Sequence, residues 1–157
     1  MNRKEFIECV ERSQKSLRRF LVSVCSGDVE LAEDIAQEAY IKAYMGVQEF
    51  QDPNKFNSWI IKIGYNTFLN HIRNKRMNIP IEDVKEFEAD DQADEEFHYE
   101  NLYQALNGLK ARERSVIVLF YLEGYSSKEI ADTLEISDEA VRQSLSRGRK
   151  RLKSLLS

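Results

Sequence analysis

Apolar residues recur at helical spacing along the first 80 residues of the chain. A first stripe ends at Gly27-Asp28, and Asp28 is a residue type that caps helix N-termini. A second stripe follows this break. A third, longer pattern runs from Trp59 to about Arg76, and Pro80 stops it. The patterns predict an N-terminal helical module, whose first two stripes are formed by Phe6, Val10, Leu17, Leu21, Val24, Leu31, Ile35, Ala39 and Ala43.

The apolar pattern becomes helical again in the last third of the chain. Ser126 and Glu129 form a capping box, because the serine can bond the amide of Glu129 while the glutamate reaches back. This box predicts a short helix over about residues 127–134. A tight turn at residues 135–137 follows, and Ser137 with the two acids after it opens another helix. Two helices joined by a three-residue turn form a helix-turn-helix.

Composition and charge divide the chain into three parts. Glycine and proline number only 6 and 2, which disfavours a turn-rich β fold. The net charge of −4 is uneven, with +2 over residues 1–80, −9 over residues 81–100 and +3 over residues 101–157. The acidic segment has few apolar residues and is expected to be an extended linker, although a solvated loop that only spaces its neighbours is an alternative. We therefore predict an all-α fold with helical modules over 1–80 and 101–157, joined by an acidic linker at 81–100.

The second helix of the predicted helix-turn-helix has a basic face opposite an apolar one. The last sixteen residues contain six basic side chains and no acid. Arginine and glutamine suit the edges of guanine and adenine, and the later cations suit phosphate. A solvated basic face on a plain helix bundle is the alternative. The face consists of Arg142, Gln143, Ser146, Arg149, Lys150 and Lys153.

Glu135 stands at the turn position where helix-turn-helix motifs commonly have glycine. A left-handed backbone there would cost a residue with a side chain roughly 1–2 kcal/mol. The turn is therefore expected to be slightly strained or differently shaped.

The long helix of the first module carries a mixed stripe on one face. Its members are spaced three or four apart, which places them on the same side of a helix. Aromatic, amide and basic groups together suit an unstacked single strand, because rings stack on bases and cations meet phosphate. The alternative is a core tryptophan with solvated neighbours. The stripe consists of Trp59, Lys62, Asn66, Asn70 and Arg73.

The preceding helix has an acidic face formed by Glu30, Asp34 and Glu38, with Glu33 and Gln37 beside them. Such a face would repel DNA, so a function for it implies a protein partner. An ordinary solvated face is the alternative.

Several classes of protein are disfavoured. The chain has no apolar run of the ~20 residues that a membrane span needs, and its first residues lack the apolar core of a signal peptide. Two cysteines and two histidines, scattered along the chain, form no zinc signature. Phosphate-cradling glycine loops and nucleophile motifs are also missing from the sequence. We therefore expect a cytoplasmic protein that is not an enzyme and has no catalytic residue, metal or cofactor.

Taken together, these segments resemble the extracytoplasmic-function sigma factors of the sigma-70 family, over nearly the whole chain. Residues 32–44, AEDIAQEAYIKAY, look like the core-binding helix of the family's region 2. Residues 56–66, FNSWIIKIGYN, look like the segment that melts and reads the downstream promoter element, and residues 119–131, LFYLEGYSSKEIA, look like the start of region 4. The order and distances of the three motifs are specific, whereas any one alone would be weak.

The resemblance implies partners and roles for the residues of each motif. It implies that core RNA polymerase meets Asp34, Gln37 and Glu38. Asn66 matches the position that contacts a base flipped from the −10 element, and Trp59 is expected to contact this DNA or support its pocket. The −10 surface is expected to comprise Trp59, Lys62, Asn66, Asn70 and Arg73. The −35 surface is expected to comprise Arg142, Gln143, Ser146, Arg147, Arg149 and Lys150.

The expected function is to direct core RNA polymerase to specific promoters and to assist their melting, with an anti-sigma factor as a further expected partner. Two departures from the family pattern are Lys110, where proline is frequent, and Ala140, where threonine is frequent. The second could alter the start of the recognition helix, so promoter preference is not carried over. Rival interpretations are a stand-alone helix-turn-helix regulator, which would act without polymerase, and a hydrolase or nucleotide-binding enzyme.

Overall fold

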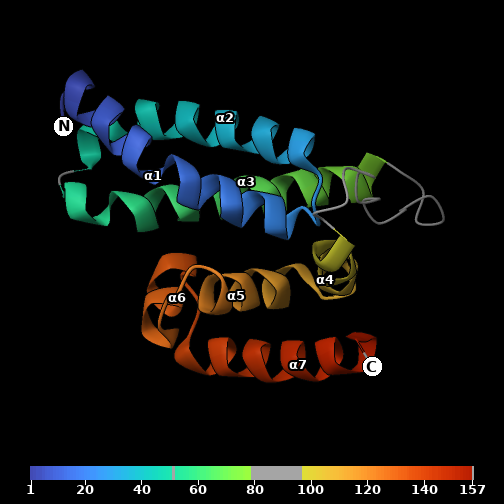
Figure 1. Ribbon diagram of the computed structural model, residues 1–157. Helices are drawn as coiled ribbons and strands as arrows, with labels where there is room; N and C mark the ends of the chain where they lie inside the picture. Colours follow the sequence, from blue (N-terminus) through green and yellow to red (C-terminus); the bar gives the residue numbers. More distant parts are fainter. Residues whose placement is uncertain (51, 79–96, 157) are drawn as a thin grey trace.

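The computed structural model describes residues 1–50, 52–78 and 97–156, and these residues form helices and turns without any strand. The helices lie in two layers (Figure 1). The first layer contains α1 (Arg3–Val24), α2 (Val29–Met45) and α3 (Phe56–Asn78), with the short 3-10 helices η1 (Val47–Glu49) and η2 (Pro53–Lys55) between α2 and α3. The expected all-α class is confirmed.

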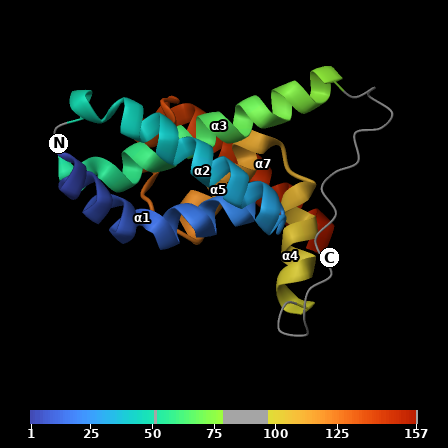
Figure 2. The ribbon, with the colours of Figure 1, turned by 90° about the horizontal axis from the view of Figure 1, so that it is seen from above.

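The second layer contains four helices that lie along one side of the first (Figures 1 and 2). Most of the predicted linker, residues 81–100, lies outside the described residues. Its end differs from the prediction, because α4 begins at Phe97. The acids Asp94, Glu95 and Glu96 immediately precede this start, and negative charge favours a helix N-terminus. The layer consists of α4 (Phe97–Asn107), α5 (Ala111–Tyr121), α6 (Ser127–Leu134) and α7 (Asp138–Leu156).

Hydrogen bonds from capping side chains explain why α2 and α6 begin where the sequence predicts. The side chain of Asp28 accepts from the amide of Leu31 at 3.0 Å and starts α2. Ser126 and Glu129 form the predicted reciprocal box, with bonds of 3.1 and 3.2 Å, at the start of α6. The predicted short helix over residues 127–134 is confirmed. The third pattern begins three residues earlier than predicted, at Phe56, after the 3-10 turn of η2.

In each layer, one glycine allows two helices to approach closely. A Cβ atom placed on Gly64 of α3 would lie 2.9 Å from Leu17 of α1, and one on Gly148 of α7 would lie 2.8 Å from Ile117 of α5. Both neighbours are core side chains, buried to 0% and 5% exposure. A larger residue at either position would therefore push two helices apart.

The two layers share one hydrophobic core. α1 packs against α4 and α5, and α3 packs against α6. The centre of this contact is polar: Arg114 of α5, buried to 6% exposure, donates to backbone carbonyls of both layers. Its Nη1 reaches Val24 O at the end of α1 at 2.7 Å, and its other donors reach carbonyls of the second layer, namely those of Leu106, Asn107 and Leu109 at 2.8, 3.3 and 2.9 Å.

We predict that Arg114→Leu lowers the free energy of unfolding by about 3 kcal/mol or more, because it leaves several buried carbonyls without a donor. Thermal unfolding followed by circular dichroism would measure the loss. The control is Lys128→Ala, since Lys128 is an exposed cation on α6 of the same layer, and its loss should stay within about 1 kcal/mol. Equal melting temperatures for the two variants would contradict the role of Arg114.

Candidate nucleic-acid and protein interfaces

The basic face of α7 lies open to solvent. Arg142, Gln143, Ser146 and Arg147 are all exposed, while Val141, Ser144, Leu145 and Gly148 turn toward the other helices and are buried. The side chain of Ser137 accepts from the amide of Ala140 at 3.0 Å and caps the start of the helix. The structure therefore presents the four polar residues together on one exposed surface, at the N-terminal half of a capped helix.

Arg149 and Lys150, from the same predicted set, have different surroundings. Lys150 is exposed. The guanidinium of Arg149 donates from Nε to the hydroxyl of Tyr121 at 2.6 Å and lies 5.6 Å from the ring centroids of both Phe120 and Tyr121. Such a cation–π contact holds Arg149 against the end of α5. A phosphate would have to compete with these contacts or be reached by the remaining donors of Arg149.

The mixed stripe of α3 is divided into an exposed part and an engaged part. Asn66, Asn70 and Arg73 are exposed, whereas Lys62 and Trp59 are half-buried. The ammonium of Lys62 forms an ion pair with Glu135, the residue at the turn between α6 and α7. Lys62 therefore has a carboxylate where a DNA-contacting lysine would have a phosphate.

Trp59 belongs to an aromatic cluster at the end of the first layer. Its ring stacks on Phe50, with centroids 4.5 Å apart and planes 9° from parallel, and it meets Phe56 edge-on at 5.7 Å. The same cluster extends through Phe6. These contacts fix the indole against the core, although part of the side chain remains exposed. The alternative of a packed tryptophan therefore describes its surroundings well, and a direct DNA contact stays a prediction.

The left-handed turn at Glu135 is present, with φ 56° and ψ 48°. This is the conformation that would be strained for a residue with a side chain. The Glu135 amide, as helix C-cap, still donates to Ala131 O, and its carboxylate reaches Lys62 of the other layer.

The acidic face of α2 combines exposed and engaged groups. Asp34 and Gln37 are exposed. Glu38 is half-buried, and its carboxylate accepts from Nε2 of His71 at 2.9 Å and pairs with Lys42 at 3.4 Å. The hydrogen bond from His71 is the main cause that lowers the pKa of Glu38; desolvation opposes it and Lys42 adds to it. The α2 helix packs on α1 and α3, and its outer face is not covered by the second layer.

The sequence patterns did not predict which side chains form hydrogen bonds and ion pairs with residues of these surfaces. His71 follows Asn70 on α3 and carried no signal of its own, yet it fixes Glu38. Glu123, which follows the end of α5, is buried to 2% side-chain exposure and receives two bonds from Arg19, at 2.6 and 2.8 Å. Both contacts join residues far apart in the sequence, so helical periodicity does not reveal them.

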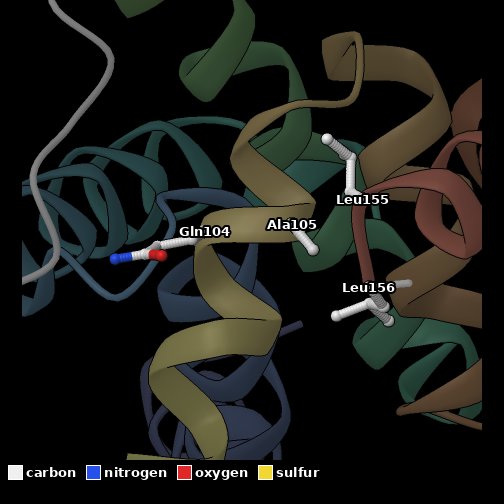
Figure 3. Close-up of a pocket in the computed structure, with 4 residues that line it drawn as sticks. All are labelled: Gln104, Ala105, Leu155 and Leu156. Carbon is white, nitrogen blue, oxygen red and sulfur yellow. The ribbon is translucent and has the colours of Figure 1, made fainter.

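The described residues contain little that suggests catalysis. No group of three or more His, Cys, Asp or Glu residues within ranges 1–50, 52–78 and 97–156 could hold a metal ion, and no helix there is long and apolar enough to cross a membrane. A groove of about 400 Å³ lies between α4 and α7, lined by Gln104, Ala105, Leu155 and Leu156 (Figure 3). Its lining offers no nucleophile or acid–base pair.

Comparison with family models identifies both halves of the chain. Residues 9–77 match the model of sigma-70 region 2, and residues 99–152 match that of sigma-70 region 4. The ECF RNA polymerase sigma factor SigW of Bacillus subtilis is 31% identical over 145 residues, which cover 83% of this chain and 78% of the relative. SigE of Mycolicibacterium smegmatis is 34% identical over 139 residues, covering 83% of this chain but 54% of the relative, so the chain spans about half of its length.

Solved structures share the arrangement as well as the helices. The sigma factor RpoE of Bartonella quintana, solved in complex with the anti-sigma factor NepR, superposes with a TM-score of 0.77 at 26% identity, covering 98% of this chain and 97% of that one. CnrH, solved with the cytosolic domain of CnrY, gives a TM-score of 0.73 at 24% identity over 99% of this chain and 89% of that one, which shows a likeness of fold.

We predict that His71→Ala raises the pKa of Glu38 toward the ordinary value of a glutamate, because the main hydrogen bond to its carboxylate is lost. A lowered pKa means that the folded state favours the ionised carboxylate; this contribution is present above the ordinary pKa and disappears as the pH falls through the folded one. An NMR titration of the carboxyl carbon would measure the change. Asn70→Ala, at the neighbouring exposed position, should leave the titration of Glu38 unaltered.

Proposed function

The chain belongs to the extracytoplasmic-function sigma factors of the sigma-70 family, and we propose that it directs core RNA polymerase to specific promoters and assists their melting. One observation carries the division of labour: an acidic face, an amide-rich stripe and a basic helix are displayed on α2, α3 and α7 of one chain. The first would contact polymerase, the second single-stranded DNA and the third duplex DNA.

The −35 element would be read by α7. Arg142, Gln143, Ser146 and Arg147 are the exposed residues of its N-terminal half, the part of a recognition helix that meets base edges. Lys150 would contact phosphate, and Arg149 would do so from its position against Tyr121. The exposure of the first four residues supports this role.

The −10 element would be held by α3. Asn66 is exposed and carries an amide that can bond the edge of a flipped base, with Asn70 and Arg73 continuing the surface along the helix. Lys62 would contact a backbone phosphate once its pair with Glu135 is broken. Trp59, stacked on Phe50, would form the wall of the base pocket.

Core polymerase would bind the outer face of α2 through Asp34, Gln37 and Glu38. Support comes from the exposure of Asp34 and Gln37 and from the bond between His71 and Glu38, which keeps that carboxylate ionised. A fixed, charged surface loses less entropy on binding than a mobile one.

We further propose two domains, one over about residues 1–80 and one from the start of α4 at Phe97 onward, joined by an acidic linker. The relative RpoE was solved with an anti-sigma factor, and this chain would be held by a partner of the same kind. It would act in the cytoplasm, where the transcription machinery is, and would supply contacts while polymerase performs the chemistry. A stand-alone helix-turn-helix regulator is the less favoured alternative, because the match to region 2 gives residues 9–77 a role that such a regulator lacks.

Run-off transcription with core polymerase tests the function. We expect start sites that depend on this protein, and Asp34→Arg should remove them by weakening polymerase binding by about 2–5 kcal/mol, because a reversed charge is placed in a complementary interface. Glu11→Arg makes the same change of charge on the exposed face of α1 and should transcribe normally. Unchanged polymerase affinity for Asp34→Arg would contradict the assignment of α2.

Substitutions in the two proposed DNA surfaces should impair different steps, namely closed-promoter binding and strand opening. Arg147→Ala should weaken binding to the closed promoter by about 1–3 kcal/mol if a base contact is lost. Asn66→Ala should leave duplex binding nearly intact but reduce strand opening, because an amide that reads a flipped base acts only after unstacking. Permanganate footprinting and binding assays on one promoter would report the two steps.

A premelted template distinguishes the two surfaces further. It should rescue Asn66→Ala more than Arg147→Ala, since only the first variant is impaired in opening. Equal rescue of both variants would show that the roles of α3 and α7 have been divided wrongly.

A further inference from the structure

Within the described part of the chain, Arg149 differs from the rest of the proposed −35 surface because other side chains hold it. Its Nε donates to the hydroxyl of Tyr121 at 2.6 Å, and its guanidinium carbon lies 5.6 Å from the ring centroids of Phe120 and Tyr121. Tyr121 is the last residue of α5 and is 56% exposed. The contact therefore lies at the surface, where it joins the end of α5 to the basic face of α7.

Arg149 lies on the same side of α7 as two residues that are proposed to read bases. Arg142, Ser146 and Arg149 are spaced four and three residues apart, so they follow one another along one face of the helix. At 1.5 Å per residue, Arg149 is about 10 Å further along the helix than Arg142. The major groove is about 12 Å wide. A helix whose N-terminal half lies in the groove therefore brings Arg149 to the phosphate backbone at its edge.

The bond to Tyr121 uses only one edge of the guanidinium group. Arginine has five N–H donors, one on Nε and four on Nη1 and Nη2. The hydroxyl of Tyr121 accepts from Nε, whereas no side chain or carbonyl of the described residues accepts from Nη1 or Nη2 of Arg149. These two nitrogens can donate in parallel to two oxygens of one phosphate. Tyr121 and a phosphate thus use different donors and do not compete for Arg149.

We propose that Tyr121 is a positioning residue for duplex DNA: it holds Arg149 so that Nη1 and Nη2 meet one backbone phosphate at the edge of the −35 element. The inference rests on the proposed function, since it concerns the same surface of α7. A long, mobile side chain loses conformational entropy when a ligand fixes it. Because the Tyr121 hydroxyl and ring already restrict Arg149 in the free protein, less entropy is lost when the phosphate binds.

Two further forces keep the cation at this place without neutralising it. The face of an aromatic ring attracts a guanidinium group, and the C-terminal end of α5, where Tyr121 stands, carries partial negative charge. Neither force involves a carboxylate, so the full charge of Arg149 remains available to DNA. A salt bridge at the same place would have to be broken before a phosphate could bind.

The residue types at both positions suit this arrangement. Phenylalanine in place of Tyr121 would keep the ring but would offer no acceptor to Nε of Arg149. Lysine in place of Arg149 would keep the charge, but its ammonium is a point charge without the planar fork that binds two phosphate oxygens. Tyr121→Phe therefore removes the positioning bond alone, whereas Arg149→Ala removes the phosphate contact itself.

The test is a double-mutant cycle in the full-length chain, without polymerase. Fluorescence anisotropy would measure the affinity for a labelled duplex of ~20 base pairs, about two helical turns, over a series of salt concentrations beginning at low salt. The cycle compares Tyr121→Phe, Arg149→Ala and the double variant with the unmodified chain. Both side chains are exposed, so the substitutions leave the hydrophobic core unchanged.

We expect the two single variants to differ in their salt dependence. Arg149→Ala should weaken binding and reduce the slope of log affinity against log salt by about 0.9, the change for one lost phosphate contact. Tyr121→Phe should weaken binding about two- to tenfold, the range for ordering one long side chain, and should leave the slope unchanged because the phosphate contact is still made. The double variant should bind like Arg149→Ala, since Tyr121 acts only through Arg149.

Tyr44→Phe is the matched control, because Tyr44 is a tyrosine of similar exposure, 52%, on α2, and its removal of a hydroxyl should leave duplex binding unchanged. Tighter binding by Tyr121→Phe would show that the tyrosine competes with DNA for Arg149 and would overturn the proposal. An equal loss from Tyr121→Phe in the presence and absence of Arg149 would also overturn it, as would an unchanged slope for Arg149→Ala. Absence of run-off transcription by the unmodified chain would contradict the proposed function, whereas the cycle on duplex alone still decides whether Tyr121 positions Arg149.

Discussion

The position of the two layers depends on one guanidinium group. A helix leaves its last carbonyls without partners and carries partial negative charge at that end. α1 and α4 both present such carbonyls toward Arg114 of α5, which donates to Val24 O from the one and to Leu106 O and Asn107 O from the other. Arginine suits this position because its planar group offers five donors and stays charged when buried. α5 can then be buried against α1 on one side and α7 on the other, and the guanidinium of Arg114 is not left buried without hydrogen-bond partners.

The interface between the layers combines this fixed centre with a more exposed rim. Of the four carbonyls that accept from Arg114, three belong to the second layer and one, Val24 O, belongs to the first. At the rim, Arg19 and Glu135 are 56% and 66% exposed, so their ion pairs are screened by solvent. Glu123 is buried, but its carboxylate accepts from Arg19 and from Ser16. It is therefore not left both buried and unpaired, which is the costly outcome for an ion pair.

The sequence predicted what depends on neighbouring residues and missed what depends on the packing of layers. Caps at Asp28 and Ser126 were predictable because donor and acceptor are three residues apart, and the exposed face of α7 followed from helical periodicity. The left-handed backbone at Glu135 was anticipated as strain, but its ion pair with Lys62 joins residues 73 positions apart. The bond from His71 to Glu38 spans 33 positions. To predict such pairs, one must know how the helices cross in space, and helical periodicity does not specify this. The helical start at Phe97 was missed because the acidic run before it made the whole of residues 81–100 resemble a linker.

Lys62 and the basic face of α7 differ in how the packing of the two layers affects them. A cation that binds phosphate is satisfied equally by a carboxylate, so any basic surface can be occupied by an acidic group of the same chain. On α3 the lysine lies beside the turn of the other layer, and Glu135 reaches it. On α7 the residues Arg142 and Arg147 lie on the face opposite the core side chains Val141 and Leu145 and are exposed. The basic face proposed to meet intact duplex is thus open to solvent, whereas the stripe proposed to meet melted strands has its lysine paired with a carboxylate of the same chain.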